Sequence, residues 1–169
     1  MEKILLTTLF LILTSCSNND IITWENYDEK SEIIENSTHE ISRMRYKRIQ
    51  SLSSDKNKIF SPFYPFLKSY DLVYHESIKE FIVNKDISTI QVYISEDKFS
   101  YEDLVKFFIY RIYKHELDKN LYLNAIISLN PNVINEAREL DKKAQKDNLL
   151  YGIPILVKDN INVKGLTTT

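Results

Sequence analysis

Glycine is the residue that this sequence most clearly lacks. Only Gly152 and Gly165 occur among 169 residues, where average usage of about 7% would give about a dozen. Glycine serves positions with positive φ or a close backbone approach, and none of the first 151 residues fills such a position with glycine. The shortage can also reflect a composition rich in Ile, Lys, Asn and Tyr. The two glycines nevertheless flank one short segment and mark it for attention.

Cysteine and net charge are equally limited. A lone cysteine, Cys16, excludes an intramolecular disulfide. Lys and Arg total 22 against 24 Asp and Glu, so we expect no nucleic-acid partner. Because His39, His75 and His115 are far apart and lack a second ligand at metal spacing, we predict neither a metal nor a cofactor. The hydrophobic fraction of 43% suffices for a globular core.

The chain opens with an apolar stretch that is too short to span a membrane. Ile4 to Leu13 covers ten residues, whereas a spanning helix needs about 20, so the stretch is typical of a signal-peptide core. The following Leu13-Thr14-Ser15-Cys16 resembles the bacterial lipobox, in which the cysteine thiolate accepts the lipid. We therefore predict a signal peptide over residues 1–15 and lipidation of Cys16, which would anchor the protein in the cell envelope on the extracytoplasmic side of a bacterial membrane. The alternative is an ordinary secretory signal with an incidental cysteine.

The chain after the predicted signal peptide is divided into two parts. Residues 16–85 are predicted to form a tether and a helical N-terminal extension with one or two amphipathic helices. Within it, Phe60 to Phe66 is aromatic and holds two prolines, which favours a loop that packs its rings on the body of the protein; a ligand-binding aromatic patch is the alternative. Residues 86–169 are predicted to form the N-terminal part of a second domain.

Helix-capping residues predict the starts of three helices within residues 86–169. Ser88 with Gln91 indicates a capping box, which favours a helix over a strand although the following residues are β-branched. Ser100 begins a second, clearly amphipathic helix that should extend to about His115. Asn130, followed by proline, begins a third that should extend to about residue 147.

Two apolar runs surround the third helix. Residues 121–129 are predicted to form a buried strand, and residues 153–157 a second one. A strand, a helix and a strand in succession predict neighbouring strands of a mixed α/β sheet.

The second predicted strand delivers a lysine at its carboxyl end, the usual place for sites in open α/β sheets. A partly desolvated Lys158 would have a lowered pKa and could act as a general base. The alternative is that Lys158 simply leaves the sheet for solvent. Asp159 and Asn160 are expected to brace the turn that follows.

The later half of the sequence resembles the amidase signature family. The resemblance covers about residues 86–169, with the order and spacing of the family's motifs, and is most specific over 152–160. Its motifs are Leu123-Asn124-Ala125-Ile126-Ile127, Asn130-Pro131, Ala137-Arg138-Glu139-Leu140-Asp141, Gly152-Ile153-Pro154-Ile155-Leu156-Val157-Lys158-Asp159-Asn160-Ile161 and Gly165-Leu166-Thr167-Thr168.

The resemblance implies a fold and an activity. It implies a mixed sheet with surrounding helices, of which this chain would hold the N-terminal helices and the first one or two core strands. It also implies hydrolysis of amide C–N bonds in a small-molecule or peptide substrate, with a serine nucleophile, a second serine on a cis peptide bond and a lysine that matches Lys158.

This sequence departs from that pattern because it has no Gly/Ser-rich segment and neither catalytic serine can be assigned by motif. We therefore expect an incomplete amidase that is inactive alone. A non-catalytic surface lipoprotein whose helices bind a partner is the alternative. A component of an amidotransferase acting on charged transfer RNA is a third reading, against which the signal peptide argues.

Overall fold

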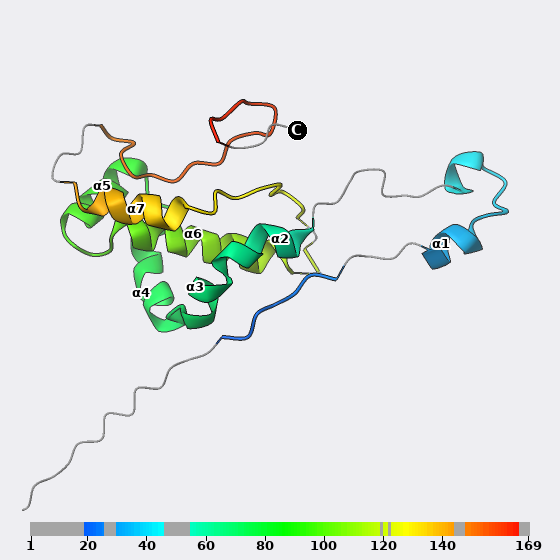
Figure 1. The fold of residues 1–169 in the computed structure, drawn as a ribbon, viewed down its shortest axis with the longest axis horizontal. Helices are drawn as coiled ribbons and strands as arrows, with labels where there is room; N and C mark the ends of the chain where they lie inside the picture. Colours follow the sequence, from blue (N-terminus) through cyan, green and yellow to red (C-terminus); the bar gives the residue numbers. More distant parts are fainter. Residues whose placement is uncertain are drawn as a thin grey trace, which may run out of the picture.

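A computed structural model describes residues 19–25, 30–45, 55–118, 120–121, 123–143 and 148–165. The predicted signal peptide, Cys16 and the predicted end of the last helix at residue 147 lie outside the described residues. All regular structure within the described ranges is helical (Figure 1), and no helix there has the length and apolar character that a bilayer crossing needs. The elements are α1 (Lys30–Glu35), η1 (Ser42–Arg45), α2 (Lys56–Phe60), η2 (Ser61–Phe63), α3 (Tyr64–Ser69), α4 (Leu72–Ile82), α5 (Ile87–Ser95), α6 (Tyr101–Glu116) and α7 (Val133–Asp141).

Helix α6 is the centre of the fold. Ser100 caps its N-terminus in a capping box with Asp103, as the sequence predicts, and acidic residues in the first turn and basic residues in the last turn complement the helix dipole. Its buried face supplies much of the hydrophobic core, together with residues of α2 to α5 and α7. The buried side chains on α6 are Tyr101, Leu104, Val105, Phe107, Ile109, Tyr113 and Glu116.

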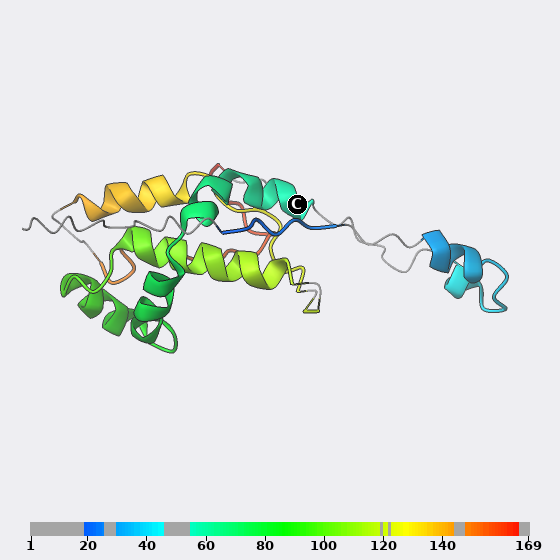
Figure 2. The same cartoon turned by 90° about the horizontal axis from the view of Figure 1, so that it is seen from below.

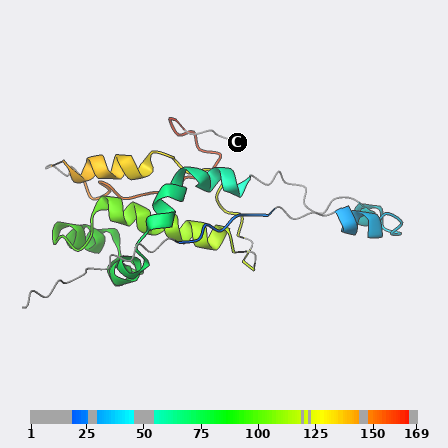
Figure 3. The ribbon, with the colours of Figure 1, turned by 60° about the horizontal axis from the view of Figure 1, so that its bottom comes forward.

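Helix α7 packs along α6 in the opposite direction (Figure 2 and Figure 3). Ala137 is its buried residue, which allows the two helices to approach closely. Beside this contact, Arg138 forms a bidentate pair with Glu102, at 2.9 Å and 2.8 Å, and the pair lowers the pKa of Glu102 to about 2. The last carboxylate of α7, Asp141, accepts hydrogen bonds from the backbone amides of Tyr101 and Glu102 at 2.8 Å and 3.0 Å. The end of α7 therefore provides hydrogen-bond acceptors for the backbone amides at the beginning of α6.

The aromatic segment at 60–66 is helical, which corrects the predicted loop. Pro62 and Pro65 occupy first-turn positions of η2 and α3, where proline is tolerated because no amide partner is lost. The prediction that the rings pack on the body is confirmed, since Phe60 and Phe63 are fully buried. Helices α1 and η1 lie in the region predicted to hold one or two amphipathic helices. They lie apart from the other helices in Figure 1 and have no buried residue among those described.

Two helix boundaries differ from the predictions. Helix α5 confirms the preference for a helix over a strand, but its cap is Asp86, which accepts from the amide of Thr89, and not Ser88. Helix α7 begins at Val133 because Asn130 accepts from the amide of Asn132 in a turn that precedes the helix. It ends at Asp141, where that side chain is engaged by α6.

The two predicted strands are wrong for the described residues. Residues 123–130 and 153–158 have no regular structure, and several of their apolar side chains are exposed, among them Leu123, Ile127 and Ile155. A strand must pair its backbone amides and carbonyls with a neighbouring strand. No described segment presents such an edge, so the predicted mixed sheet is not formed and the described residues are helical.

A buried ion pair stabilises the far end of α6. Lys56 and Glu116 are each 3% exposed and pair with each other, and the second carboxylate oxygen of Glu116 accepts from the amide of Ala125 at 2.8 Å. Breaking a buried pair leaves an uncompensated charge, so we predict that Lys56→Met lowers the free energy of unfolding by about 3–5 kcal/mol. Urea denaturation measures this loss. The double variant Lys56→Met with Glu116→Gln should lose less than Lys56→Met alone, and equal losses would contradict the explanation.

A buried histidine makes stability depend on pH. His75 is stacked on Phe107 at 4.4 Å between ring centroids and contacts the hydroxyl of Tyr70 through Nδ1. Burial lowers the pKa of His75 from its usual 6.5, with a smaller opposing effect from Glu76. Because the unfolded chain binds the proton more readily, stability should be complete above about pH 6.5 and decline as the pH falls below it. Denaturation across pH 5 to 8 should show this decline, and His75→Phe should reduce it.

Candidate active-site segment

The residues before Lys158 are fixed to the helical body by tyrosines. Tyr151 packs edge-on against Tyr101, with ring centroids 5.4 Å apart, and its hydroxyl donates to the carbonyl of Leu140 at 2.9 Å. Tyr101 is fully buried in the core. Tyr151 thus connects the segment to the start of α6 and the end of α7 together.

A glutamine on α5 holds the same segment through its backbone. The side-chain amide of Gln91 donates to the carbonyls of Leu149 and Tyr151, both at 2.8 Å. Its oxygen accepts from the hydroxyl of Tyr101 at 2.7 Å. Gln91 was predicted to complete a capping box, and its true partners, about 60 residues along the chain, were missed. A polar side chain on the otherwise apolar face of α5 was the only signal for them.

Gly152 is required by both backbone conformation and space. Its φ is +68°, in the region that favours glycine, and a Cβ at this position would lie 2.3 Å from the Tyr101 ring. Gly165 also has a positive φ, of +87°, but a Cβ there would meet nothing within 4 Å. The first glycine therefore permits the close approach of the segment to α6, whereas the second serves only a turn.

Lys158 itself is directed into solvent. Its side chain is 74% exposed and pairs with Asp159 at 3.0 Å. The amide of Ile161 donates to the carbonyl of Lys158 at 2.9 Å, so Asp159 and Asn160 lie in a turn, as expected. The prediction of a desolvated lysine at a strand end is wrong for this structure, because neither the strand nor a covering wall is formed around it.

The residues that precede and follow Lys158 expose apolar surface. The segment between the anchored Gly152 and the turn presents three consecutive apolar residues to solvent, and the turn adds a fourth. These residues are Ile155, Leu156, Val157 and Ile161, with exposed fractions between 40% and 74%. Figure 1 shows residues 161–165 as a loop that stands off the helices. Contiguous exposed apolar surface of this kind is a mark of an interaction site.

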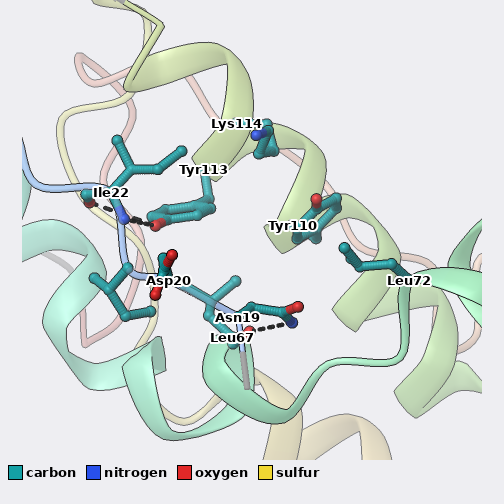
Figure 4. Close-up of a pocket in the computed structure, with 9 residues that line it drawn as sticks. Asn19, Asp20, Ile22, Leu67, Leu72, Tyr110, Tyr113 and Lys114 are labelled. Atoms are coloured by element: carbon teal, nitrogen blue, oxygen red, sulfur yellow. Dashed lines mark hydrogen bonds between the residues drawn. The ribbon is translucent and has the colours of Figure 1, made fainter. Parts of the chain in front are cut away.

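A shallow hollow of about 200 Å³ lies between residues 19–22, the end of α3 and the second half of α6 (Figure 4). Tyr110, Tyr113 and Lys114 of α6 line it, together with Leu67 and Leu72. It does not include Lys158 or the segment around it. In the parts of the chain that the structure describes, no group of three or more His, Cys, Asp or Glu side chains is placed to hold a metal ion.

The later part of the chain, which includes this segment, is similar to known proteins. Residues 103–169 match the Amidase family. The A subunit of glutamyl-tRNA(Gln) amidotransferase from Oceanobacillus iheyensis is 37% identical over 84 residues, which are 49% of this chain and 16% of that protein. Its counterpart from Limosilactobacillus fermentum is 41% identical over 87 residues, 50% of this chain and 17% of its own length.

A solved structure agrees with the sequence relatives. An amidase family protein from Bacillus anthracis has a TM-score of 0.61 and 32% identity, over 70% of this chain and 24% of its own. The chain thus spans about a sixth of the curated relatives and a quarter of the solved one. These matches support the predicted relationship to the amidase signature family, and the helical arrangement is consistent with the corresponding part of an amidase fold. The domain boundary predicted at residue 86 stays a prediction.

Substitution of the two glycines separates space from backbone strain. Both Gly152→Ala and Gly165→Ala place a side chain at positive φ, which costs about 1–2 kcal/mol. Gly152→Ala must also move Tyr101, and overpacking of this kind adds about 1–3 kcal/mol. We therefore expect Gly152→Ala to lower the free energy of unfolding clearly more than Gly165→Ala does, as measured by urea denaturation. Equal losses would show that the contact with Tyr101 is unimportant.

Proposed function

We propose that this chain supplies the lysine-bearing N-terminal portion of a lipid-anchored, extracytoplasmic amidase that hydrolyses C–N bonds. The observation that supports it best is the segment Gly152 to Asn160. The residues immediately before it are fixed to α5 and α6 by Gln91 and Tyr151, Gly152 lies against the ring of Tyr101, and its Lys-Asp-Asn part is presented outward. An anchored base with an open approach suits completion by further residues of an active site.

In this proposal Lys158 is the general base of a Ser–Lys arrangement. It receives the proton of a serine hydroxyl through a second serine as the first serine attacks the amide carbonyl, and returns it to the leaving amine. Neither serine can be assigned in this sequence, so the whole reaction needs residues that these 169 do not supply. The substrate is a small-molecule or peptide amide, and no nucleic acid is expected at the site.

The exposed apolar residues fit the same proposal. Residues 153–157 would become a strand once a neighbouring strand satisfies their amides and carbonyls, and Ile155 and Val157 would then be covered. Burial of the strand would also remove water from around Lys158. We therefore expect the desolvation of Lys158 that the sequence predicts only when further residues cover this segment.

Two other functions remain as alternatives. The exposed apolar surface at 155–161 also suits a non-catalytic lipoprotein that binds a partner through this segment. The amidotransferase components among the relatives favour a role in amide transfer, but a signal peptide and lipidation at Cys16 would separate this protein from charged transfer RNA. Detection of the native protein in the envelope or in the cytoplasm distinguishes these two.

The role of Lys158 is testable in the native organism. We expect Lys158→Ala, introduced at the native gene, to abolish amide hydrolysis by the envelope fraction while protein abundance is unchanged, because the base is lost and the fold is not. Lys164→Ala removes another exposed lysine a few residues later and should leave activity intact. Normal amide hydrolysis by the envelope fraction of the Lys158→Ala strain would refute the role of Lys158 as the general base. A native protein with no activity in any form would favour the partner-binding alternative.

A further inference from the structure

The segment that follows Cys16 is fastened to the helical body. We call residues 19–24 the strap. Asn19 donates from its side-chain amide to the carbonyls of Leu67 and Tyr70, at 3.0 Å and 2.9 Å, and from its backbone to the carbonyl of Lys68 at 2.8 Å. All three acceptors are at the end of α3, which leaves Asn19 little freedom to move away from it.

Two more contacts fasten the rest of the strap. The amide of Ile22 donates to the hydroxyl of Tyr113 on α6, as Figure 4 shows. Trp24 and Asn57 exchange a pair of hydrogen bonds, each 2.9 Å long. The strap is thus bound at both ends and in the middle, to α3, α6 and α2.

The strap limits how far a lipid on Cys16 can lie from the body. Only Ser17 and Asn18 stand between Cys16 and Asn19. The three steps from Cys16 to Asn19 cover at most about 3.3–3.6 Å each in a fully extended chain, or about 11 Å in all. The end of α3, which Asn19 contacts directly, therefore lies close to the modified residue, and Leu72 at the start of α4 lines the same hollow as Asn19.

We propose that the end of α3 and the start of α4 form a membrane-facing surface, held against the bilayer by the strap. The inference rests on the proposed lipidation of Cys16. The surface includes Leu72 and Val73, which are 39% and 83% exposed. An exposed apolar pair at this position suits the boundary between headgroups and acyl chains.

Charge contributes little to this orientation. Asp20 and Lys114 line the hollow beside the strap, and Lys68 and Asp71 are exposed at the end of α3 and the start of α4, so the positive and negative charges there balance. Covalent reach and the exposed apolar pair therefore determine the orientation, and salt should not reverse it. Residues 153–165 lie on the opposite side of α6 from the strap in Figure 1. The orientation would present the Lys158 segment away from the membrane.

Fluorescence quenching tests the orientation in the full lipidated chain. Lipidation occupies the only natural thiol, so Val73→Cys or Ile155→Cys provides a single labelling site. Each labelled protein is reconstituted in phosphatidylethanolamine–phosphatidylglycerol vesicles with a nitroxide-headgroup lipid. We expect the label at 73 to lose most of its emission and the label at 155 to keep most of it, at low and at high salt. Equal quenching at both positions, or stronger quenching at 155, would overturn the proposal.

Release of the strap provides the matched control. Asn19→Ala with Asn57→Ala removes the contacts at both ends of the strap while Cys16 stays available for the lipid. This variant should remain in the membrane fraction but lose the difference between the two labels. Unchanged quenching at 73 would show that the strap does not set the orientation. Absence of the lipid mass on Cys16 in the wild-type protein would refute the lipid anchor itself, a failure distinct from a lipidated protein that lies in another orientation.

Discussion

The carboxylate of Asp141 at the N-terminus of α6 is the interaction on which the described structure depends most. A helix begins with backbone amides that have no partner within it. Asp141 accepts from two of them, those of Tyr101 and Glu102, while Ser100 satisfies the next through the capping box. This contact fixes where α7 ends, aligns α7 along α6, and holds Tyr101 in its fully buried position.

The placement of the candidate segment follows from Tyr101. Its hydroxyl orients Gln91, the amide of Gln91 holds two carbonyls of the segment, and its ring leaves room only for a glycine at position 152. One of the two glycines in the sequence, Gly152, lies at this contact because any Cβ there would displace the buried ring of Tyr101. The segment is therefore held against the core as far as Ile153 and exposed from Ile155 onward. This division explains how the motif of residues 152–160 can be recognisable while Lys158 still lacks an enclosed environment.

The same body carries the strap on its other side. Both attachments use side-chain amides that bind backbone carbonyls, Asn19 at the end of α3 and Gln91 at residues 149 and 151. An amide group donates two hydrogen bonds, so one side chain can restrain a peptide segment at two points. In our proposal the helical body would act as a spacer between the anchor and the active-site segment, and would keep Lys158 clear of the membrane surface.

Local signals in the sequence determined a good part of this protein. The cap at Ser100 and the period of the apolar residues located α6 almost to the residue, because capping and amphipathic spacing act within a few positions. The order and spacing of the motifs between 123 and 168 indicated the amidase relationship that the comparisons support. The scarcity of glycine pointed to Gly152, although the reason for it, the ring of Tyr101, could not be read from composition.

Contacts between distant residues were decided only by tertiary structure. Residues 121–129 and 153–157 have the composition of strands, but a strand exists only beside another strand, and the described residues supply none. Lys56 has a buried partner 60 residues away, and Gln91 has partners as distant, so neither role follows from local pattern. The exposure of Lys158 has the same origin: the sequence determined which residue stands there, and the surrounding structure decided whether water reaches it.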